Sequence, residues 1–524
     1  MKKLFFLASA LLCGAISVGA VDYLVQTGKD GDGKWTDAAI TALGVDTKNV
    51  IDLSKDGATL PTTGEIWFAA GKYEFKAQYA IAAKAKLYGS FAGTETSVEA
   101  RALVSGGKAY EFENPTIFNV VQPTGENTTP LKLFPDGRGE IVLNGLTIQG
   151  SSSTGTGNDG GALKMGDGSV VSNCQFKNNV SLRNGGAVIA YDINATIENS
   201  YFEGNSATGR GGAIEFSAGA TSTDKVLIIR GCTFVSNQSL ATSSAGGGAI
   251  YTGGASSVTI SGNIFCNNTS KYHGAAIHDN VNNTSVIVNN LVYNNSALGT
   301  AGITVIATKP LHFSNNTIVN NIGNVYFIAG TSACDICNNV VYGNLNSTAE
   351  DAKATSFSFA ASTAVSGVYT LNNYLTNSLP TDGRCVTVKA EGDTDMNVIS
   401  SANPGFKYPT SFVGATEDSD QLKQILAAKW NIVSEKKLID AGVDLTYITT
   451  DILNAERSNG GFDIGAYELT YEAVSTAIEN TEKTPLDIQA ALQAGEVYNL
   501  LGQRVGELQA GNIYIVGGQK ILMR

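Results

Sequence analysis

The sequence predicts an all-β solenoid, in which the chain winds through successive coils of short parallel strands. Along the middle of the 524-residue chain, an apolar residue is repeatedly followed three positions later by asparagine. The interval between these apolar residues varies, from 23 residues (Ile318 to Val341) to 32 (Phe202 to Phe234). A tandem-glycine unit recurs in phase with them. Repeats of this period are typical of solenoids.

The first repeat unit is built on an apolar anchor within a short alternating segment bounded by Gly, Asn and Ser, which is typical of a strand. The anchors are Phe176, Phe202, Phe234, Phe265, Val292, Ile318 and Val341. The asparagines that follow them are Asn179, Asn205, Asn237, Asn268, Asn295, Asn321 and Asn344. Three residues before each anchor stands Asn or Gly, and both tolerate a left-handed turn. We expect the seven asparagines to stack as one ladder of amide hydrogen bonds at a buried turn.

The second repeat unit is a glycine corner, where the backbone needs positive φ or approaches the next coil closely. Its copies begin at Gly160, Gly185, Gly211 and Gly247, with a weaker copy at Gly274. Alternation along the strand after each corner predicts an exposed ladder, made of Lys164, Ile189, Glu215, Tyr251 and His278. The residues after the anchors predict a second exposed ladder: Lys177, Glu203, Val235, Cys266, Tyr293, Val319 and Tyr342.

These units resemble the repeats of the polymorphic outer membrane proteins and, more broadly, the pectate-lyase-like right-handed parallel β-helix. The flanking segments also resemble secreted β-helix proteins of the Bacteroidetes. The matching stretches are 23–35 (YLVQTGKDGDGKW), 64–73 (GEIWFAAGKY), 87–101 (LYGSFAGTETSVEAR), 403–406 (NPGF) and 462–468 (FDIGAYE). The resemblance implies the fold and a cell-surface setting, and leaves the ligand or substrate open.

The N-terminus predicts export. Residues 1–20 combine Lys2 and Lys3 with a short apolar run and a small-residue cleavage site, the pattern of a signal peptide. No other apolar run is long enough to cross a bilayer. The formal net charge is −12 without a basic patch, which argues against nucleic acid as a partner. We therefore expect a secreted or outer-membrane cell-surface protein.

The domain organisation follows the change in pattern along the chain. We expect a parallel β-helix over 21–470, clearest over 140–346, then a polar linker over 471–490 and a C-terminal module over 491–524. Residues 36–43 predict a short helix that plugs the open end of the coils, as solenoids need. Residues 418–430 predict an amphipathic helix beside the last coils. Gly517 and Gly518, between two apolar runs, predict a tight hairpin.

The C-terminal stretch 497–524 (VYNLLGQRVGELQAGNIYIVGGQKILMR) resembles the sorting domain of the type IX secretion pathway. The resemblance rests on the strand-like YNLLGQRV, on G-x-IYIV and on a basic, apolar ending. It implies a module that the secretion machinery recognises.

Six cysteines follow the predicted signal peptide, and an even number in a secreted protein raises the possibility of disulfides. Cys174 and Cys232 share a register two coils apart, about 9.6 Å at the parallel-strand spacing, which is too far to bridge. We expect most of these cysteines to be buried free thiols. The Cys334–Cys337 pair has no second pair or nearby histidine to make a metal site.

The best candidate cluster for chemistry comprises Lys271, Tyr272 and His273 with His278 and Asp279. These residues offer a possible base, a carboxylate and an aromatic platform for a sugar ring. The alternative is a polar loop before a glycine corner, with no functional role. Together with Lys164, Glu215, Tyr251 and Tyr293, they are the candidate binding residues.

Two functions from different classes remain open. The first is adhesion or glycan binding along an exposed strand face, with an extracellular glycan or a host or bacterial surface ligand as the partner. The second is a carbohydrate-active enzyme, a polysaccharide lyase or hydrolase. The chain lacks a paired-Asp motif or a run of Arg and Lys on one strand, which favours binding. We expect no cofactor and no metal, with calcium implied only if the protein is a lyase.

Overall fold

The computed structural model describes most of residues 21–469 and, after them, 497–499, 504–506, 513–516 and 519–522. The gaps within 21–469 are 126–127, 136–138, 155–159, 243–245, 299–301, 308–309, 329–333, 360–367, 379–396, 433–437 and 458–460. The chain divides into two compact units, Met1–Leu469 and Thr470–Arg524.

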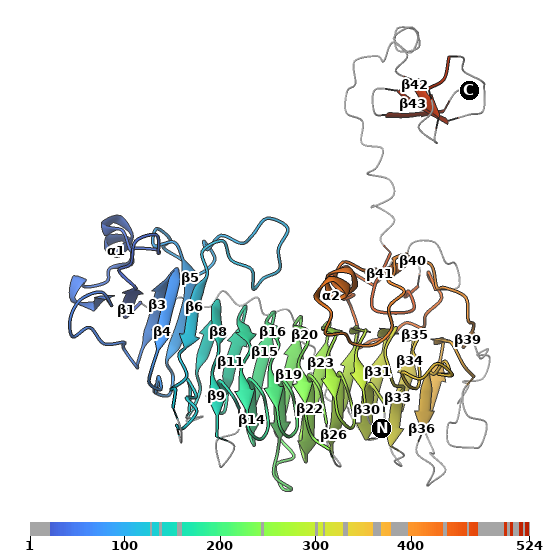
Figure 1. Cartoon of the computed structure of the whole chain (residues 1–524), viewed down its shortest axis with the longest axis horizontal. Helices are drawn as coiled ribbons and strands as arrows, with labels where there is room; N and C mark the ends of the chain where they lie inside the picture. The colour runs from blue at the N-terminus through green and yellow to red at the C-terminus, as the bar shows by residue number, and fades with distance from the viewer. Residues whose placement is uncertain are drawn as a thin grey trace. The chain divides into compact units, whose positions relative to one another are not determined.

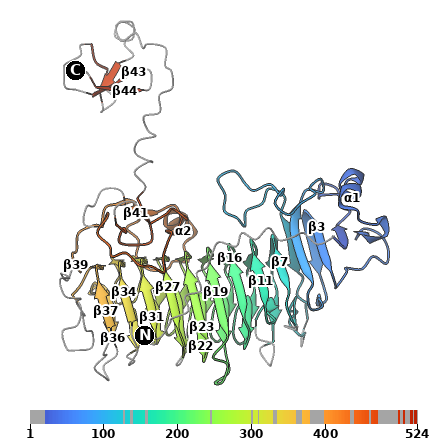
Figure 2. The ribbon, with the colours of Figure 1, turned by 180° about the vertical axis from the view of Figure 1, so that it is seen from behind.

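The first unit is a parallel β-helix whose coils run through four sheets (Figures 1 and 2). A full coil passes from the glycine sheet to the 13-stranded sheet, then to the anchor sheet and the 6-stranded sheet, and returns through a glycine corner. Each strand pairs in parallel with its equivalent in the next coil, as Phe176 with Phe202 and Leu163 with Val188. The predicted all-β solenoid is confirmed.

The four sheets are defined by the following strands in spatial order. The 13-stranded sheet contains β2 (Val50–Asp52), β1 (Tyr23–Gln26), β3 (Glu65–Ala69), β5 (Lys86–Phe91), β7 (Val142–Asn144), β11 (Ser169–Ser172), β15 (Ala195–Glu198), β19 (Val226–Arg230), β23 (Ser257–Ser261), β27 (Ser285–Val288), β31 (Leu311–Ser314), β34 (Cys334–Cys337) and β37 (Val368–Leu371). The anchor sheet contains β4 (Gly71–Phe75), β6 (Thr116–Val120), β8 (Leu146–Gln149), β12 (Gln175–Lys177), β16 (Tyr201–Glu203), β20 (Thr233–Val235), β24 (Ile264–Cys266), β28 (Leu291–Tyr293), β32 (Thr317–Val319), β35 (Val340–Tyr342), β38 (Tyr374–Leu375) and β39 (Val398–Ile399).

The two smaller sheets complete each coil. The glycine sheet contains β10 (Leu163–Lys164), β14 (Val188–Tyr191), β18 (Ile214–Ser217), β22 (Ile250–Gly254), β26 (Ile277–Val281), β30 (Thr304–Ala307), β33 (Val325–Ile328) and β36 (Phe357–Phe359). The 6-stranded sheet contains β9 (Ser152–Ser153), β13 (Val180–Ser181), β17 (Ser206–Ala207), β21 (Gln238–Ser239), β25 (Thr269–Ser270) and β29 (Ser296–Ala297).

The anchors fill the interior. The rings of Phe176, Phe202, Phe234 and Phe265 stack along the axis with centroids 4.9–5.0 Å apart. All four are fully buried in one continuous apolar core. Aromatic burial of this kind contributes about 1.5–3 kcal/mol for each ring.

The glycine corners are required by close backbone approach. The first glycine of each corner has positive φ, as at Gly185 (64°). A Cβ on the second glycine would meet the next coil: at Gly186 it would lie 1.9 Å from the carbonyl oxygen of Gly212. No other residue fits this position without moving the backbone.

The predicted asparagine ladder is present between the anchor sheet and the 6-stranded sheet. Asn205 Nδ2 donates to Asn237 Oδ1 at 2.9 Å, and Asn237 repeats this bond to Asn268. The ladder runs unbroken from Asn179 to Asn344. Each amide also donates to a carbonyl of the preceding coil, as Asn237 does to Phe202. The buried amides are therefore fully paired along the stack.

The residue before each ladder asparagine takes the left-handed conformation and faces outward. At this position φ is 52° for Asn178, 63° for Gly204 and 55° for Ser236. The same arrangement closes the turn on the other side of the anchor sheet, where a second ladder runs through Asn263, Asn290, Asn316, Asn339, Asn373 and Asn397. This second ladder was not among the predictions from the sequence.

The N-terminal helix α1 (Asp37–Leu43) forms as predicted, but it does not plug the end of the coils. Thr36 caps it, and Ala39 packs with Trp67 and Tyr88 on the outer face of the 13-stranded sheet. These large outward aromatic rings require a cover, which the helix supplies. The segment after the helix, which begins with the short 3₁₀ helix Thr47–Asn49, packs against the core in its place. It does so through Ile51, Leu53 and Leu60.

Residues 403–469, the strap, fold back over the outer face of the anchor sheet (Figure 1). The strap contains α2 (Ser419–Leu426) and the antiparallel pair β40 (Phe406–Tyr408) and β41 (Lys429–Ile432). The predicted helix over 418–430 is therefore shorter, and Trp430 belongs to a strand. Apolar strap residues such as Trp430 and Phe406 pack with outward residues of the anchor sheet, including Tyr293 and Val319.

The second unit contains β42 (Val497–Asn499), β43 (Ile513–Val516) and β44 (Gln519–Leu522) in one antiparallel sheet. β43 and β44 pair as the hairpin that the glycine pair predicts. The predicted linker 471–490 lies outside the described residues.

The five cysteines within the described residues are buried and outside any disulfide, as expected: Cys174, Cys232, Cys266, Cys334 and Cys337. Cys385 lies outside the described part of the chain. In the part of the chain that the model describes, no helix is long and apolar enough to span a membrane.

Candidate functional site

Several of the predicted candidate residues meet at one corner of the glycine sheet, together with Arg210. Arg210 Nη2 lies 2.8 Å from Glu215 Oε1, and Nη1 donates to the Tyr251 hydroxyl at 3.1 Å. The guanidinium also lies over the Tyr251 ring, 4.5 Å from its centroid. The Tyr251 ring packs 5.1 Å from that of His278, which lies 6.0 Å from His273. We call this group the histidine corner.

The predicted exposure of this ladder is wrong. Glu215, Tyr251 and His278 point outward but are only 2%, 5% and 4% exposed. Arg210 extends over Glu215 and Tyr251, and His273 packs beside His278. Alternation along a strand predicts that a side chain points outward. It does not predict whether a loop from another part of the coil covers that side chain.

Burial also determines the charge of the imidazoles. It lowers the pKa of His278 to about 3, and the nearby His273 and Arg210 add to the effect. Burial lowers the pKa of His273 as well. The Nδ1 atoms of both rings are buried without a hydrogen-bond partner among the described residues. His278 is therefore buried from solvent, neutral and weakly basic. These properties do not suit general-base catalysis near neutral pH.

Three other predicted residues lie away from the corner. Asp279 points into the core, where it accepts from Thr252 at 2.6 Å and Ser285 at 2.5 Å, so it cannot act with His278. Tyr293 is buried under the strap against Trp430, on a sheet that does not adjoin the glycine sheet. Lys164 is half-buried on β10, two coils before Glu215.

Few of the predicted side chains at the corner are accessible to solvent. Lys271 is exposed, and Tyr272 is half-buried with its ring 3.7 Å from that of His273. Among the residues that the model describes, no group of three or more His, Cys, Asp or Glu side chains could hold a metal ion. Contacts at the corner therefore join five predicted residues, but its buried members serve packing. The five are Glu215, Tyr251, Tyr272, His273 and His278.

An accessible polar surface lies instead on the anchor sheet, in the coils before the strap. Five outward residues occupy one register there and form what we call the polar strip: Glu74, Asn119, Gln149, Lys177 and Glu203. All are exposed or half-buried. At about 4.8 Å for each coil the strip is about 19 Å long.

Contacts along the polar strip pair its two amides with each other and its one cation with a carboxylate. Gln149 Nε2 donates to Asn119 Oδ1 at 2.8 Å. Lys177 Nζ lies 3.7 Å from Glu203 Oε2 and 5.3 Å from the ring centroid of Tyr201. Both ion-pair partners are partly exposed, so each stays available to a ligand.

Two segments border this surface (Figures 1 and 2). Residues 93–115 reach over neighbouring outward positions of β12, β16 and β20, where the Tyr110 hydroxyl also donates to Thr233. Tyr110 stacks on Tyr201 at 5.3 Å and accepts a hydrogen bond from Gln175 at its carbonyl oxygen. Toward the later coils the strap begins, since Val235 of β20 is already buried in the apolar cluster of the strap.

The strap is fixed by outward asparagines at both edges of the anchor sheet. Along one edge, Asn267, Asn294 and Asn320 donate to strap carbonyls between Thr410 and Thr416. Along the other edge, Asn289, Asn315, Asn338 and Asn372 donate to carbonyls of Thr450, Asp463, Val443 and Ala441 respectively. The left-handed positions therefore hold an extended chain across successive coils.

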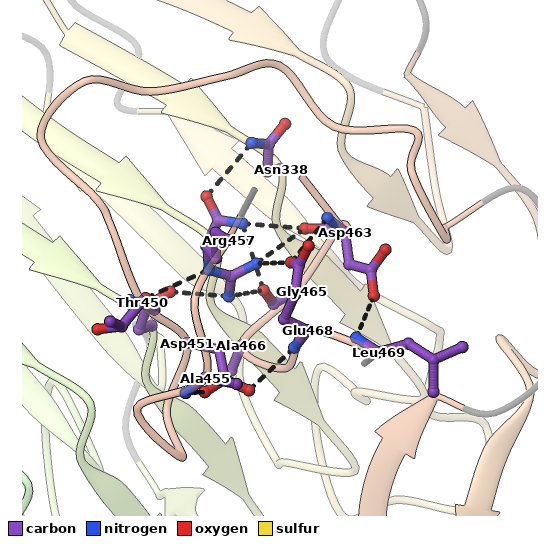
Figure 3. A network of polar contacts seen from close by, with 12 residues as sticks. Asn338, Thr450, Asp451, Ala455, Arg457, Asp463, Gly465, Ala466, Glu468 and Leu469 are labelled. Carbon is purple, nitrogen blue, oxygen red and sulfur yellow. Dashed lines mark hydrogen bonds and ion pairs between the residues drawn. The ribbon is translucent and has the colours of Figure 1, made fainter. Parts of the chain in front are cut away.

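A buried network centred on Arg457 closes the strap (Figure 3). Arg457 Nη1 lies 2.9 Å from Glu468 Oε2, and both side chains are almost fully buried. The guanidinium also donates to Asn289 Oδ1 and to the carbonyl of Gly465. Asp463 accepts from the backbone of Asp440 and Leu469. The segment FDIGAYE thus has a structural role here, joining the end of the strap to the coils.

Sequence reasoning missed the polar strip, although Lys177 and Glu203 stood in the predicted outward ladder. The sequence pattern treated all members of that ladder as equally exposed. The strap covers the later members, including Val235 and Tyr293. The apolar character of those later members could have indicated that another segment covers them. Arg210 carried no pattern that would have identified it.

Comparison with known proteins places the fold. A family model described as "Right handed beta helix region" matches residues 103–265. Among solved structures, the crystal structure of pectate lyase Pel9A aligns over 87% of this chain and 98% of that one, with 13% identity and a TM-score of 0.40. No curated protein matches the chain in sequence. The protein is a right-handed parallel β-helix protein.

Proposed function

We propose that this protein is exported to the cell surface and binds an extended glycan along the outer face of the anchor sheet. The observation that carries the proposal is the polar strip, which has one outward polar residue in each coil and is bordered by residues 93–115 and by the strap. Amide and carboxylate groups in such a row offer paired hydrogen-bond donors and acceptors to sugar hydroxyls. A periodic surface suits a periodic polymer better than it suits a small molecule.

The enzymatic alternative is a polysaccharide lyase or hydrolase. A lyase of this fold class would need a basic residue and, typically, calcium held by clustered carboxylates. The polar strip contains two carboxylates at opposite ends, Glu74 and Glu203, about 19 Å apart at the parallel-strand spacing. That separation is too large for a pair acting on one glycosidic bond, which supports binding over hydrolysis.

A glycan array probed with the mature protein tests the proposal. Soluble oligosaccharides should be assayed in parallel for new reducing ends and for unsaturated products, with and without calcium. We expect binding to at least one polysaccharide without products. Calcium-dependent unsaturated products would replace the proposal with a lyase.

We further propose that residues 491–524 direct export by a type IX-like route. The support is the resemblance of 497–524 to such sorting domains and the antiparallel sheet in this unit. Deleting residues 490–524 should leave the protein in the periplasm, as measured by protease accessibility on intact cells. Equal surface labelling of the truncated and full-length chains would contradict this route.

A further inference from the structure

The strap already shows how an extended polymer lies on this face. Between residues 410 and 416 it runs along successive coils, parallel to the axis of the β-helix. Asn320 donates to the carbonyl of Thr410, Asn294 to that of Phe412, and Asn267 to that of Thr416. Each coil thus contributes one outward amide, and those of Asn294 and Asn320 each donate to two carbonyl oxygens of the bound chain.

The same row of left-handed positions continues beyond the strap. After Thr416 the chain turns into α2, and the next positions toward the N-terminus are Ser236, Gly204 and Asn178. Asn178 is exposed and lies directly after Lys177 of the polar strip. A line continued from residues 410–416 of the strap therefore reaches the polar strip. No described segment of the chain runs along that line there.

Charge around this continuation disfavours an anionic ligand. Lys177 is neutralised by Glu203, and Lys72, beside the strip, lies 3.7 Å from Glu74. The bordering segments add acidic side chains: Glu111 and Glu113 against Lys108 on one side, and exposed Glu417, Asp418 and Asp420 on the other. A polyanion would meet repulsion from both segments that border the surface.

From this geometry we infer that the ligand is an uncharged glycan that lies parallel to the helix axis, its oxygens accepting hydrogen bonds from Asn178, Gln149 and Asn119. The inference rests on the proposed function and names the ligand class and direction for the same surface. Sugar hydroxyl and ring oxygens take the place that backbone carbonyls occupy in the strap. Gln149 also donates to Asn119, so the two amides hold one another in place.

The test uses the full mature chain and two sets of soluble polysaccharides in affinity electrophoresis and calorimetry. The neutral set contains xylan, arabinan, galactan, mannan and β-glucan, and the acidic set contains polygalacturonate, alginate and chondroitin sulfate. We expect binding within the neutral set, with an affinity that changes little across a tenfold range of salt, because screening acts only on charge.

Two variants locate the site. Asn178→Gly keeps the left-handed backbone, since glycine occupies the equivalent position at Gly204. Gln149→Ala removes the central amide. Each should weaken binding about fivefold, the equivalent of one hydrogen bond, with an unchanged melting temperature. Asn280→Ala, an exposed amide on the glycine sheet, is the matched control and should bind as the parent does.

The outcomes separate the inference from the proposed function. Binding confined to acidic polysaccharides and weakened by salt would overturn the uncharged ligand class while leaving glycan binding intact. Neutral binding that survives both variants would overturn the placement on the polar strip. Binding to neither set, with capture of an extended peptide instead, would refute the proposed function itself.

Discussion

At the residue scale, the fold is stabilised by amides that pair in rows rather than in isolated contacts. Asn237 accepts from the backbone and side-chain nitrogens of Asn205 and donates to Asn268 and to the carbonyl of Phe202. Removing one such side chain leaves partners unpaired in two neighbouring coils. Buried unpaired groups cost more than the net value of the bond that is lost.

The first prediction follows from this pairing. Asn237→Ala should lower the free energy of unfolding by about 1–3 kcal/mol, as measured by denaturant titration. Asn199→Gly is the control, because this exposed asparagine has the left-handed φ that glycine adopts at Gly231 in the next coil. The control should differ from the parent by a few tenths of a kcal/mol. Equal effects of the two substitutions on the free energy of unfolding would contradict a stabilising role for the paired amides of the ladder.

The second prediction concerns His278 and pH. The folded pKa is lowered to about 3, below the ordinary value of 6.5, so the folded state favours the neutral ring. The stability that this group contributes is therefore complete above pH 6.5 and is lost as the pH falls toward 3. The loss is about 1.4 kcal/mol for each pH unit in this window.

This pH dependence is measured by comparing the parent with His278→Gln in denaturant titrations between pH 7 and pH 4.5. Arg210, His273 and Glu215 remain in both proteins, so the difference between the two curves isolates His278. The variant should lose less stability on acidification than the parent does. Parallel curves would show that His278 takes up its proton without cost in the folded protein.

The residue-scale predictions from sequence succeeded where the pattern was local. The interval between Phe234 and Asn237 fixes both within one coil, so their burial followed from the repeat. The exposure of Tyr251 could not be predicted in this way. Arg210, which covers it, lies 41 positions earlier in the sequence, and the hydrogen bond between them depends on how two corners stack.

At the scale of elements, the strap determines which part of the anchor sheet is open. Its contacts join residues more than a hundred positions apart, as between Asn267 and Thr416 or Asn289 and Arg457. A repeat pattern carries no information about such pairs, which explains why Tyr293 was expected to be exposed. The Arg457 network is the point at which the end of the strap meets the coils.

The third prediction tests that network. Arg457→Met should destabilise the strap by about 3–5 kcal/mol, because Glu468, Asn289 and the carbonyl of Gly465 lose their buried charged partner. Trp430, buried against Phe406 and Tyr293, should then become exposed, with a red shift in fluorescence and faster proteolysis of residues 403–469. The control is Lys423→Met, which removes a largely exposed ion pair with Asp420 and should change neither signal. An unshifted spectrum in Arg457→Met would contradict a closing role for the network.

At the scale of the whole molecule, the β-helix presents a long face, and the strap leaves one stretch of it open. The coil architecture was predictable because every coil repeats the same local constraints of anchor, turn and corner. The open stretch was not, because it is defined by two long segments that come from outside the repeat. The proposed ligand is therefore an inference from the polar strip and from the path of the strap, not from the repeat itself.

The most direct test of this account is a crystal structure of the mature protein soaked with the neutral oligosaccharide that binds best. The account predicts a chain of sugar rings along the polar strip, parallel to the axis, with oxygens within hydrogen-bond distance of Gln149 and Asn178. A ligand bound at the histidine corner, or one that crosses the coils at a right angle to the axis, would contradict it.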